Sequence, residues 1–167
     1  MDSISLSYEE LVLASTAAGM NTSRVLKRGA DRSDHGQSTE RGVTQRLAND
    51  ILGEIGERAV ARKIEAVQTR GTELREIGDL SGDHEVKTTE YDGGHLLLHE
   101  DSPDDARFFL AVVSFDDQIR VSLPGWLRGR EGKKDRFWGN RGSQKQPCYW
   151  VPQDQLRSYK ALDILTK

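Results

Sequence analysis

The strongest constraint on the fold is a change of hydrophobic period along the chain. Apolar residues recur at helical spacing over about Thr44 to Ile64, at Leu47, Ile51, Leu52, Ile55, Ala59, Val60 and Ile64. From about Leu74 the pattern changes to short extended runs separated by turn residues. A long one-sided helix followed by strands favours an α/β or α+β sandwich, with one central mixed sheet flanked by helices.

Two glycines, Gly53 and Gly56, interrupt this long helical segment. A glycine inside a helix costs about 1 kcal/mol relative to alanine. Close packing against a neighbouring element would compensate for that cost. We therefore expect another part of the backbone to approach the helix at these positions.

The extended runs predict a meander, a hairpin and a short closing unit. The meander comprises residues 77–80, 84–89 and 95–99, with turns at Ser81-Gly82-Asp83 and Gly93-Gly94. The hairpin comprises a buried strand at 108–115 and a second strand at 118–123, which Pro124-Gly125 should end. A last strand is expected at 149–151, and Pro152 should begin a closing helix through about Tyr159.

The first 43 residues are expected to form an appendage to one compact domain. Ser7 and Glu10 have the spacing of a capping box, and the apolar residues that follow predict a short helix up to Ala18, ended by Gly19. Residues 21–42 are polar and without period, which is typical of a loop or mobile arm. Residues 44–167 should then form the domain itself, because 167 residues are too few for two large domains.

Composition favours a cytoplasmic protein of a bacterium or a phage-infected cell. The single cysteine, Cys148, excludes an internal disulfide, and nothing beside it would activate its thiol. No stretch approaches the roughly 18 apolar residues that span a bilayer, and the first eight residues do not have the pattern of a signal peptide. We therefore expect no membrane partner.

Positive charge is concentrated in one stretch of an otherwise acidic chain. The net charge is −3, yet residues 125–146 carry +5, which leaves −8 elsewhere. The cations of this basic segment are Arg128, Arg130, Lys133, Lys134, Arg136, Arg141 and Lys145. Such a patch on an acidic body steers a polyanion to one face, which predicts a loop that grips nucleic-acid phosphates. Trp126, Phe137 and Trp138 lie among these cations, where they would either stack on unpaired bases or anchor the core.

Residues 79–87 contain the side chains that metal-dependent phosphodiester hydrolysis needs. Glu85 and Lys87 are two apart on a predicted strand and so project from the same face, whereas His84 projects from the other. The short turn before them brings Asp79 towards the same end of the sheet. One or two carboxylates are enough to hold Mg²⁺, and a lysine beside them can orient water or neutralise phosphate. Asp83, at the tip of the turn, is a rival to Asp79.

These residues resemble the motif of the PD-(D/E)XK superfamily of restriction-endonuclease-like nucleases. Gly78-Asp79, a short gap and then Glu85-Val86-Lys87 match its strand motif, and the Gly56-Glu57 pair on the long helix matches the helix glutamate of many members. The match covers roughly residues 50 to 123. It departs from the family in two ways, because Gly78 stands where the motif has proline and because residues 102–106 leave room for only one helical turn between the middle strands.

The resemblance implies a restriction-endonuclease-like core and a role for each matching residue. Asp79 and Glu85 would be metal ligands, Lys87 the catalytic lysine, Glu57 a further ligand or a residue that positions one, and the carbonyl of Val86 a further metal contact. Glu54 shares a helix face with Glu57 and is the alternative there. The implied activity is Mg²⁺-dependent hydrolysis of DNA, with Mn²⁺ as a substitute, RNA as an alternative substrate, endonuclease preferred to exonuclease, and a homodimer compatible with the family.

Other interpretations are possible for these assignments. The strand motif is also consistent with an ordinary cross-strand ion pair on a solvated hairpin. His95 and His99 would lie about 13 Å apart on a strand, which does not suit zinc. At the level of function, the rivals are a nucleic-acid-binding or assembly module with a vestigial site, and a carboxylate metal hydrolase that acts on another substrate.

Overall fold

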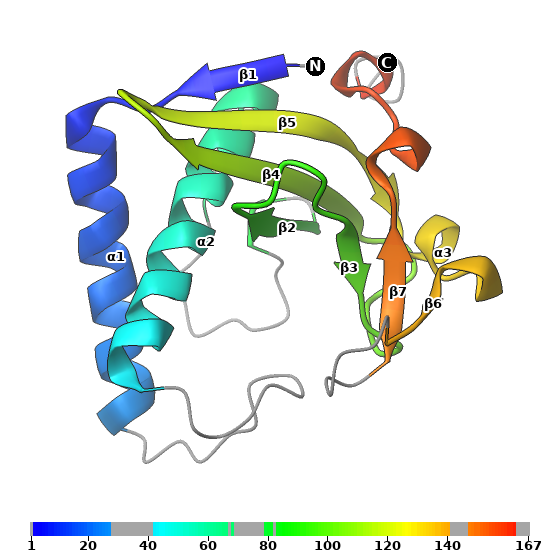
Figure 1. Cartoon of the computed structure of the whole chain (residues 1–167), viewed down its shortest axis with the longest axis horizontal. Helices are drawn as coiled ribbons and strands as arrows, with labels where there is room; N and C mark the ends of the chain where they lie inside the picture. The colour runs from blue at the N-terminus through cyan, green and yellow to red at the C-terminus, as the bar shows by residue number, and fades with distance from the viewer. Residues whose placement is uncertain are drawn as a thin grey trace.

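The computed structural model describes residues 2–27, 42–66, 68, 79–81, 83–140 and 147–162. Helix α2 (Val43–Ile64) packs on one face of a four-stranded mixed sheet, and helix α1 (Tyr8–Lys27) lies beside α2 (Figure 1). The strand order is β1-β5-β4-β2, and only the β2–β4 pair is parallel. The strands are β1 (Asp2–Ser5), β2 (His84–Thr89), β4 (Arg107–Phe115) and β5 (Ile119–Arg128). The expected α/β class with a mixed sheet is thus confirmed.

A second, three-stranded sheet packs against β4 on the other face of the first sheet. Its order is β3-β7-β6, formed by β3 (Leu96–Leu98), β7 (Cys148–Val151) and β6 (Trp138–Gly139). Short helical turns complete the described chain: α3 (Gly129–Gly132) and the 3₁₀ turns η1 (Asp135–Phe137), η2 (Gln153–Gln155) and η3 (Tyr159–Ala161). Among the described residues no helix is long and apolar enough to cross a membrane.

Strand β4 is buried on both faces, which explains its continuous apolar sequence. Phe109, Ala111 and Val113 face α2 and join one core cluster. Phe108, Leu110 and Val112 face β3 and β7 and join a second cluster. Alternate residues of a strand point to opposite faces, so a strand between two layers must be apolar at nearly every position. The predicted hairpin of β4 and β5, with a well-buried first strand, is confirmed.

Helix α2 was predicted almost to the residue, and Gly56 shows why a glycine stands in its middle. Ile55, Ala59 and Val60 are fully buried against the sheet. A Cβ at Gly56 would lie 2.1 Å from Thr88 Oγ1 and 2.9 Å from Thr88 Cγ2, so only a glycine lets α2 approach β2 this closely. Close packing at Gly56 is confirmed, and it brings the helix motif beside the strand motif.

The prediction that β5 ends at Pro124-Gly125 is wrong. The strand continues to Arg128, with an irregularity in its pairing to β4 between Leu110 and Val112. Gly125 has a φ of +154°, and a Cβ there would lie 2.3 Å from the carbonyl oxygen of Arg157. The proline and the glycine therefore accommodate a β-bulge and a close backbone neighbour instead of a strand end. Part of the expected basic loop is consequently strand, and α3 and η1 follow it.

Other boundary predictions also need correction. Helix α1 runs through Gly19 to Lys27, so the expected loop is wrong for residues 21–27, while residues 28–41 lie outside the described part. Thr22 and Asn21 donate hydrogen bonds to Asp50 Oδ2 at 2.7 and 3.4 Å, which holds this end of α1 against α2. Strand β1 was missed.

The expected meander and closing helix are wrong as well. Strand β2 pairs with β4, and β3 pairs with β7 in the second sheet, because residues 90–106 cross from one layer to the other. Between Pro152 and residue 162, the last one described, the chain forms two 3₁₀ turns and no α-helix. The last strand predicted near 149–151 is confirmed as β7.

Candidate active site

Glu85 and Lys87 lie side by side on the face of β2 that points away from α2. Lys87 Nζ is 3.6 Å from Glu85 Oε2, and the two side chains keep 36% and 26% of their surface exposed. The ammonium group also lies 5.8 Å from the centroid of the Phe108 ring on β4. The predicted shared face is confirmed, and both groups remain reachable from solvent while their stems rest on apolar surface.

The turn before β2 brings Asp79 to the start of this strand. Leu80 N–H donates to the carbonyl of His84 at 3.0 Å, which folds the chain back as predicted. Asp79 Oδ2 accepts a hydrogen bond from the backbone N–H of Val86 at 2.9 Å. The carboxylate of Asp79 therefore lies against the edge of β2 that does not pair with β4. Gly78 and Gly82 lie outside the described residues.

The charges of Asp79 and Lys87 both act on Glu85. Burial raises the pKa of Glu85, the negative charge of Asp79 raises it further, and Lys87 opposes both effects. A half-buried acid beside a like charge favours its protonated form unless a cation compensates. The donor set of Asp79 and Glu85 thus fits a hard divalent cation, which would relieve this repulsion.

Asp83, the rival acid, has a structural place in the turn. Its φ is +57°, in the left-handed region that aspartate tolerates better than most residues. Its carbonyl accepts the N–H of Arg107 at 3.0 Å, which joins the turn to the start of β4. Asp83 is exposed, whereas the carboxylate of Asp79 contacts β2. The geometry favours Asp79.

Glu54 and Glu57 both lie buried on α2, with 3% and 1% of their surface exposed. Neighbouring Gly56 packs on Thr88, which points to the face of β2 opposite to Glu85. Among the described residues, no three His, Cys, Asp or Glu side chains form a group that could hold a metal ion. The ligand role of Glu57, and the choice between Glu57 and Glu54, stay predictions.

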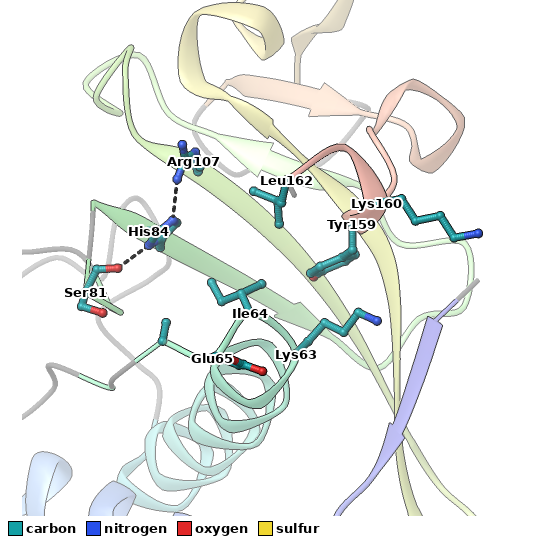
Figure 2. A pocket seen from close by; sticks show the side chains of 10 residues that line it. Lys63, Ile64, Glu65, Ser81, His84, Arg107, Tyr159, Lys160 and Leu162 are labelled. Carbon is teal, nitrogen blue, oxygen red and sulfur yellow. Dashed lines mark hydrogen bonds between the residues drawn. The ribbon is translucent and has the colours of Figure 1, made fainter. Parts of the chain in front are cut away.

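His84 faces away from Glu85, as the alternation along β2 predicts. Its ring is buried, with Nδ1 against the carbonyl of Ser81 and Nε2 3.1 Å from Nη1 of Arg107 (Figure 2). Because the guanidinium donates, Nε2 must accept and Nδ1 must carry the proton. Burial lowers the pKa of His84, and the charge of Arg107 lowers it further. This histidine is a neutral connector between the turn and β4.

Ion pairs offset part of the charge of the basic segment. Arg130 lies 2.7 Å and Arg128 4.0 Å from Asp105, and Lys133 lies 2.9 Å from Asp104. Glu131 pairs with Arg157. The carboxylates of Asp104 and Asp105 are 64% and 79% exposed, and a pair with so exposed a partner contributes only about 0–1 kcal/mol. A phosphate can therefore replace the carboxylate.

The remaining cations of the segment differ in their surroundings. Arg136 donates to Gln155 at 2.8 Å and lies over the ring of Phe137. Lys134 is exposed, whereas Arg141 and Lys145 lie outside the described residues. The segment begins near the motif, because His84, Arg107 and Arg128 form one row across β2, β4 and β5. The ends of that row, His84 and Arg128, are two strand spacings apart, which is about 10 Å.

The aromatic residues of the basic segment serve different purposes. Trp126 is fully buried, so it anchors the core and cannot stack on a base. Trp138 is 44% exposed, with its ring centroid 4.7 Å from that of Tyr149. Cys148 is buried, as expected.

His95 lies just before β3, and the segment that joins it to His99 is extended, as predicted. The ring of His95 contacts the ring of Trp150, with centroids 6.2 Å apart.

Sequence reasoning missed Arg107 and Tyr159, which line a pocket on the α2 side of the sheet. No sequence pattern marks them, because residues 63–66, 81–84 and 159–162 come together only in the folded chain.

No known protein family, curated protein or solved structure matches this chain.

Proposed function

We propose that this protein is a divalent-metal-dependent nuclease that hydrolyses phosphodiester bonds of DNA. The observation that carries the proposal is that Asp79 contacts β2 beside Glu85, which in turn pairs with Lys87. The same acids and lysine, in the same chain order, form the strand motif of restriction-endonuclease-like nucleases. The next long strand, β4, runs parallel to the motif strand, which is further support.

Each residue has a distinct task in this proposal. The carboxylates of Asp79 and Glu85 would hold Mg²⁺ or Mn²⁺. Such an ion supplies an activated water and stabilises charge on the phosphate. The N–H of Val86 points to Asp79, and because N–H and C=O of one strand residue leave by the same edge, its carbonyl would be a further contact for an ion held by Asp79. Lys87 would orient the attacking water or neutralise the phosphate.

The basic segment would position the substrate beside this edge. It leaves the sheet at Arg128, in the same row as the start of β2. Phosphate contacts fix the place of a nucleic acid without reading its sequence. Binding and chemistry would therefore rest on different residues, which allows each to be tested separately.

A direct test compares DNA cleavage by the wild type, Glu85→Gln and Glu90→Gln. Supercoiled, linear and single-stranded DNA are incubated with Mg²⁺, with Mn²⁺ and with a chelator. We expect metal-dependent cleavage that is lost in Glu85→Gln and kept in Glu90→Gln, because Glu90 is an exposed acid just beyond β2. Cleavage that survives in Glu85→Gln, or that ignores the chelator, would contradict the proposal.

A second candidate function is a nucleic-acid-binding module with a vestigial site. The observation that favours it is that, in the described part of the chain, only two acids meet at β2 and no larger metal-binding group forms. This candidate predicts DNA binding without Mn²⁺ uptake. Calorimetric titration of Mn²⁺ into the wild type and into Asp79→Asn separates the two candidates.

A further inference from the structure

A pocket of about 370 Å³ opens on the face of the sheet that carries His84, opposite to Glu85 and Lys87. Its walls are the end of α2, the start of β2 and β4, and the η3 turn (Figure 2). The volume lies within the range of small-molecule sites, and Ile64 and Leu162 give it an apolar wall.

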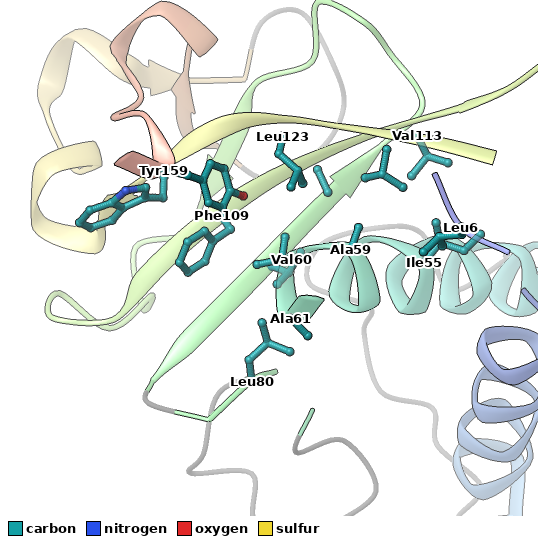
Figure 3. Packing of buried hydrophobic residues seen from close by; sticks show 14 of the residues in the cluster. Leu6, Ile55, Ala59, Val60, Ala61, Leu80, Phe109, Val113, Leu123 and Tyr159 are labelled. Atoms are coloured by element: carbon teal, nitrogen blue, oxygen red, sulfur yellow. The ribbon is translucent and has the colours of Figure 1, made fainter. Parts of the chain in front are cut away.

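Tyr159 gives the pocket a buried polar group with no partner. The residue is 4% exposed, and its hydroxyl has no hydrogen-bond partner within the described structure. Its ring packs on Phe109 in the core, with centroids 5.7 Å apart (Figure 3). Burial raises the pKa of the phenol, so the hydroxyl keeps its proton and can donate it. Buried hydroxyls without partners are uncommon in native proteins, and a ligand oxygen would satisfy this one.

Arg107 gives the pocket a cation that is already held in place. Its guanidinium donates to His84 and lies 5.8 Å from the ring of Trp126. Within the described residues, no carboxylate forms an ion pair with it. A fixed guanidinium is suited to bind a phosphate with two parallel hydrogen bonds.

Charges of both signs surround the pocket. Lys63, Arg107 and Lys160 line it against one carboxylate, Glu65, while Lys63 shares its charge with Asp2 at 3.2 Å. The carboxyl end of α2 contributes only about half a negative charge. The carboxylate of Asp2 also acts on Tyr159, and that of Asp83 acts on His84. The two signs of charge are therefore close to balance around the pocket, and the attraction for a phosphate rests on Arg107 itself.

The wall that holds Tyr159 is fixed before any ligand arrives. Trp126 and Arg157 exchange two backbone hydrogen bonds of 3.0 and 2.9 Å, and Trp126 Nε1 donates to the carbonyl of Ser158 at 3.2 Å. These bonds tie the segment before η3 to β5. This wall of the pocket is therefore preformed, which reduces the entropy lost on binding.

We propose that this pocket binds a nucleoside phosphomonoester, with the phosphate on Arg107, an oxygen of the ligand on the Tyr159 hydroxyl, and the apolar part of the nucleoside on Ile64 and Leu162. The ligand is either a free mononucleotide or the 5′-terminal nucleotide of a strand. Binding of either ligand does not depend on the nuclease activity, because the pocket and the motif lie on opposite faces of β2.

The test is calorimetric titration of the full chain with a chelator present, so that no cleavage occurs. Deoxyadenosine 5′-monophosphate is compared with deoxyadenosine, and a 5′-phosphorylated oligonucleotide with its 5′-hydroxyl counterpart. Tyr159→Phe keeps the packed ring and removes only the hydroxyl, while Arg107→Gln removes the charge. Arg62→Gln, an exposed arginine paired with Glu10 outside the pocket, is the matched control.

We expect saturable binding of the phosphorylated ligand and none of the nucleoside. Affinity should fall about tenfold or more in Tyr159→Phe and in Arg107→Gln, the loss typical of one hydrogen bond to a charged group, and stay unchanged in Arg62→Gln. Preference for the phosphorylated oligonucleotide would assign the pocket to strand ends, and binding of the mononucleotide alone would assign it to free nucleotides.

The proposal is overturned if neither phosphorylated ligand binds, or if both pocket variants bind as the wild type does. Asp79→Asn should keep this binding while it loses cleavage. Failure of the pocket and failure of the nuclease proposal are thus seen in different variants.

Discussion

Lys87 lies between an acid and an aromatic ring, and this position defines what the residue can do. Its ammonium group contacts Glu85 and sits over Phe108, and more than a third of its side chain is exposed. An exposed ion pair of this kind contributes little to stability. We therefore expect Lys87 to contribute to catalysis, because its positive charge beside two carboxylates can contact a phosphate.

Replacement of Lys87 by alanine should abolish cleavage and leave binding intact. Removal of one stabilising group from an active site typically costs about 100- to 1000-fold in kcat. Asp79, Glu85 and the basic segment remain in this variant, so Mn²⁺ and DNA should bind as before. Single-turnover cleavage, calorimetry and a gel-shift assay measure the three properties. Full activity in the variant would remove Lys87 from the site.

The two aspartates of the turn give a second prediction. Asp79→Asn should lose metal-dependent cleavage, because a neutral amide is a poorer ligand for a hard cation. Asp83→Asn should stay active, since asparagine also tolerates the left-handed conformation found at this position. Cleavage rates and Mn²⁺ affinities of both variants decide between them. A silent Asp79→Asn with a damaging Asp83→Asn would reverse the assignment of the turn.

His84 predicts how stability depends on pH. Its pKa in the folded chain lies below the ordinary value of 6.5, so the unfolded chain binds the proton more readily. The stability that this neutral histidine contributes is present above pH 6.5 and is lost as the pH falls below that value. His84→Gln removes the titration and keeps a group that can accept from Arg107. We expect Tm to fall more steeply between pH 7 and 5 in the wild type than in the variant, and parallel curves would contradict this.

For helices and strands, hydrophobic periodicity predicts an element correctly where a neighbouring element buries its apolar positions. The α2 helix was predictable because its apolar positions follow helical spacing and the sheet buries them. The extent of α1 was not, since nothing in residues 21–27 shows that Thr22 will meet Asp50 on α2. Gly19 has open space around it and no capping role.

Strand partners were harder to predict than the strands themselves. The hydrophobic pattern of residues 96–98 shows a strand but not which strand it pairs with, and its partner β7 lies about 50 residues away in sequence. Pro124-Gly125 looks like a strand end because a bulge and a turn favour the same residues. The Asp79, Glu85 and Lys87 cluster was predictable because it depends only on a tight turn and strand alternation, which are local.

Gly56 is the point where helix and motif strand meet, and its substitution tests that contact. Gly56→Ala places a methyl group 2.1 Å from Thr88 Oγ1, and this overpacking should cost about 1–3 kcal/mol. Each kcal/mol corresponds to a fall in Tm of roughly 2–4 °C for a chain of this size. Adding Thr88→Ala removes both close atoms and should restore most of the loss. Thermal unfolding of the two single variants and the double variant measures the coupling, and additive effects would show that the two residues do not touch.

For the whole molecule, charge is distributed so that one region favours a polyanion. The chain is acidic outside residues 125–146, and the pairs that Asp104 and Asp105 form with the basic segment leave Lys134 and Arg136 exposed. The segment begins in the row of strand residues that starts at His84. A nucleic acid held there would lie near the start of β2 and would be repelled by the acidic remainder.

Neutralisation of Lys133, Lys134 and Arg136 together should therefore weaken binding of all DNA sequences alike. Each phosphate contact that is lost lowers the dependence of log affinity on log salt by about 0.9 for duplex DNA, because one fewer condensed counterion is released. Cleavage at saturating substrate should survive, since none of the three residues is near Asp79 or Glu85 in sequence or supplies a metal ligand. Fluorescence anisotropy over a series of salt concentrations measures the slope, with Arg62→Gln as the surface control.

The substitution Asp104→Asn should have the opposite effect on DNA binding. The change removes the carboxylate that lies 2.9 Å from Lys133, so affinity should rise and the salt dependence should steepen. Opposite shifts in the two variants would assign the binding surface to this segment by charge alone. If the triple variant keeps the affinity and the salt slope of the wild type, the segment is not the substrate groove. The search would then move to Arg24 and Lys27 at the end of α1, and to Arg28 and Arg32, which lie outside the described residues.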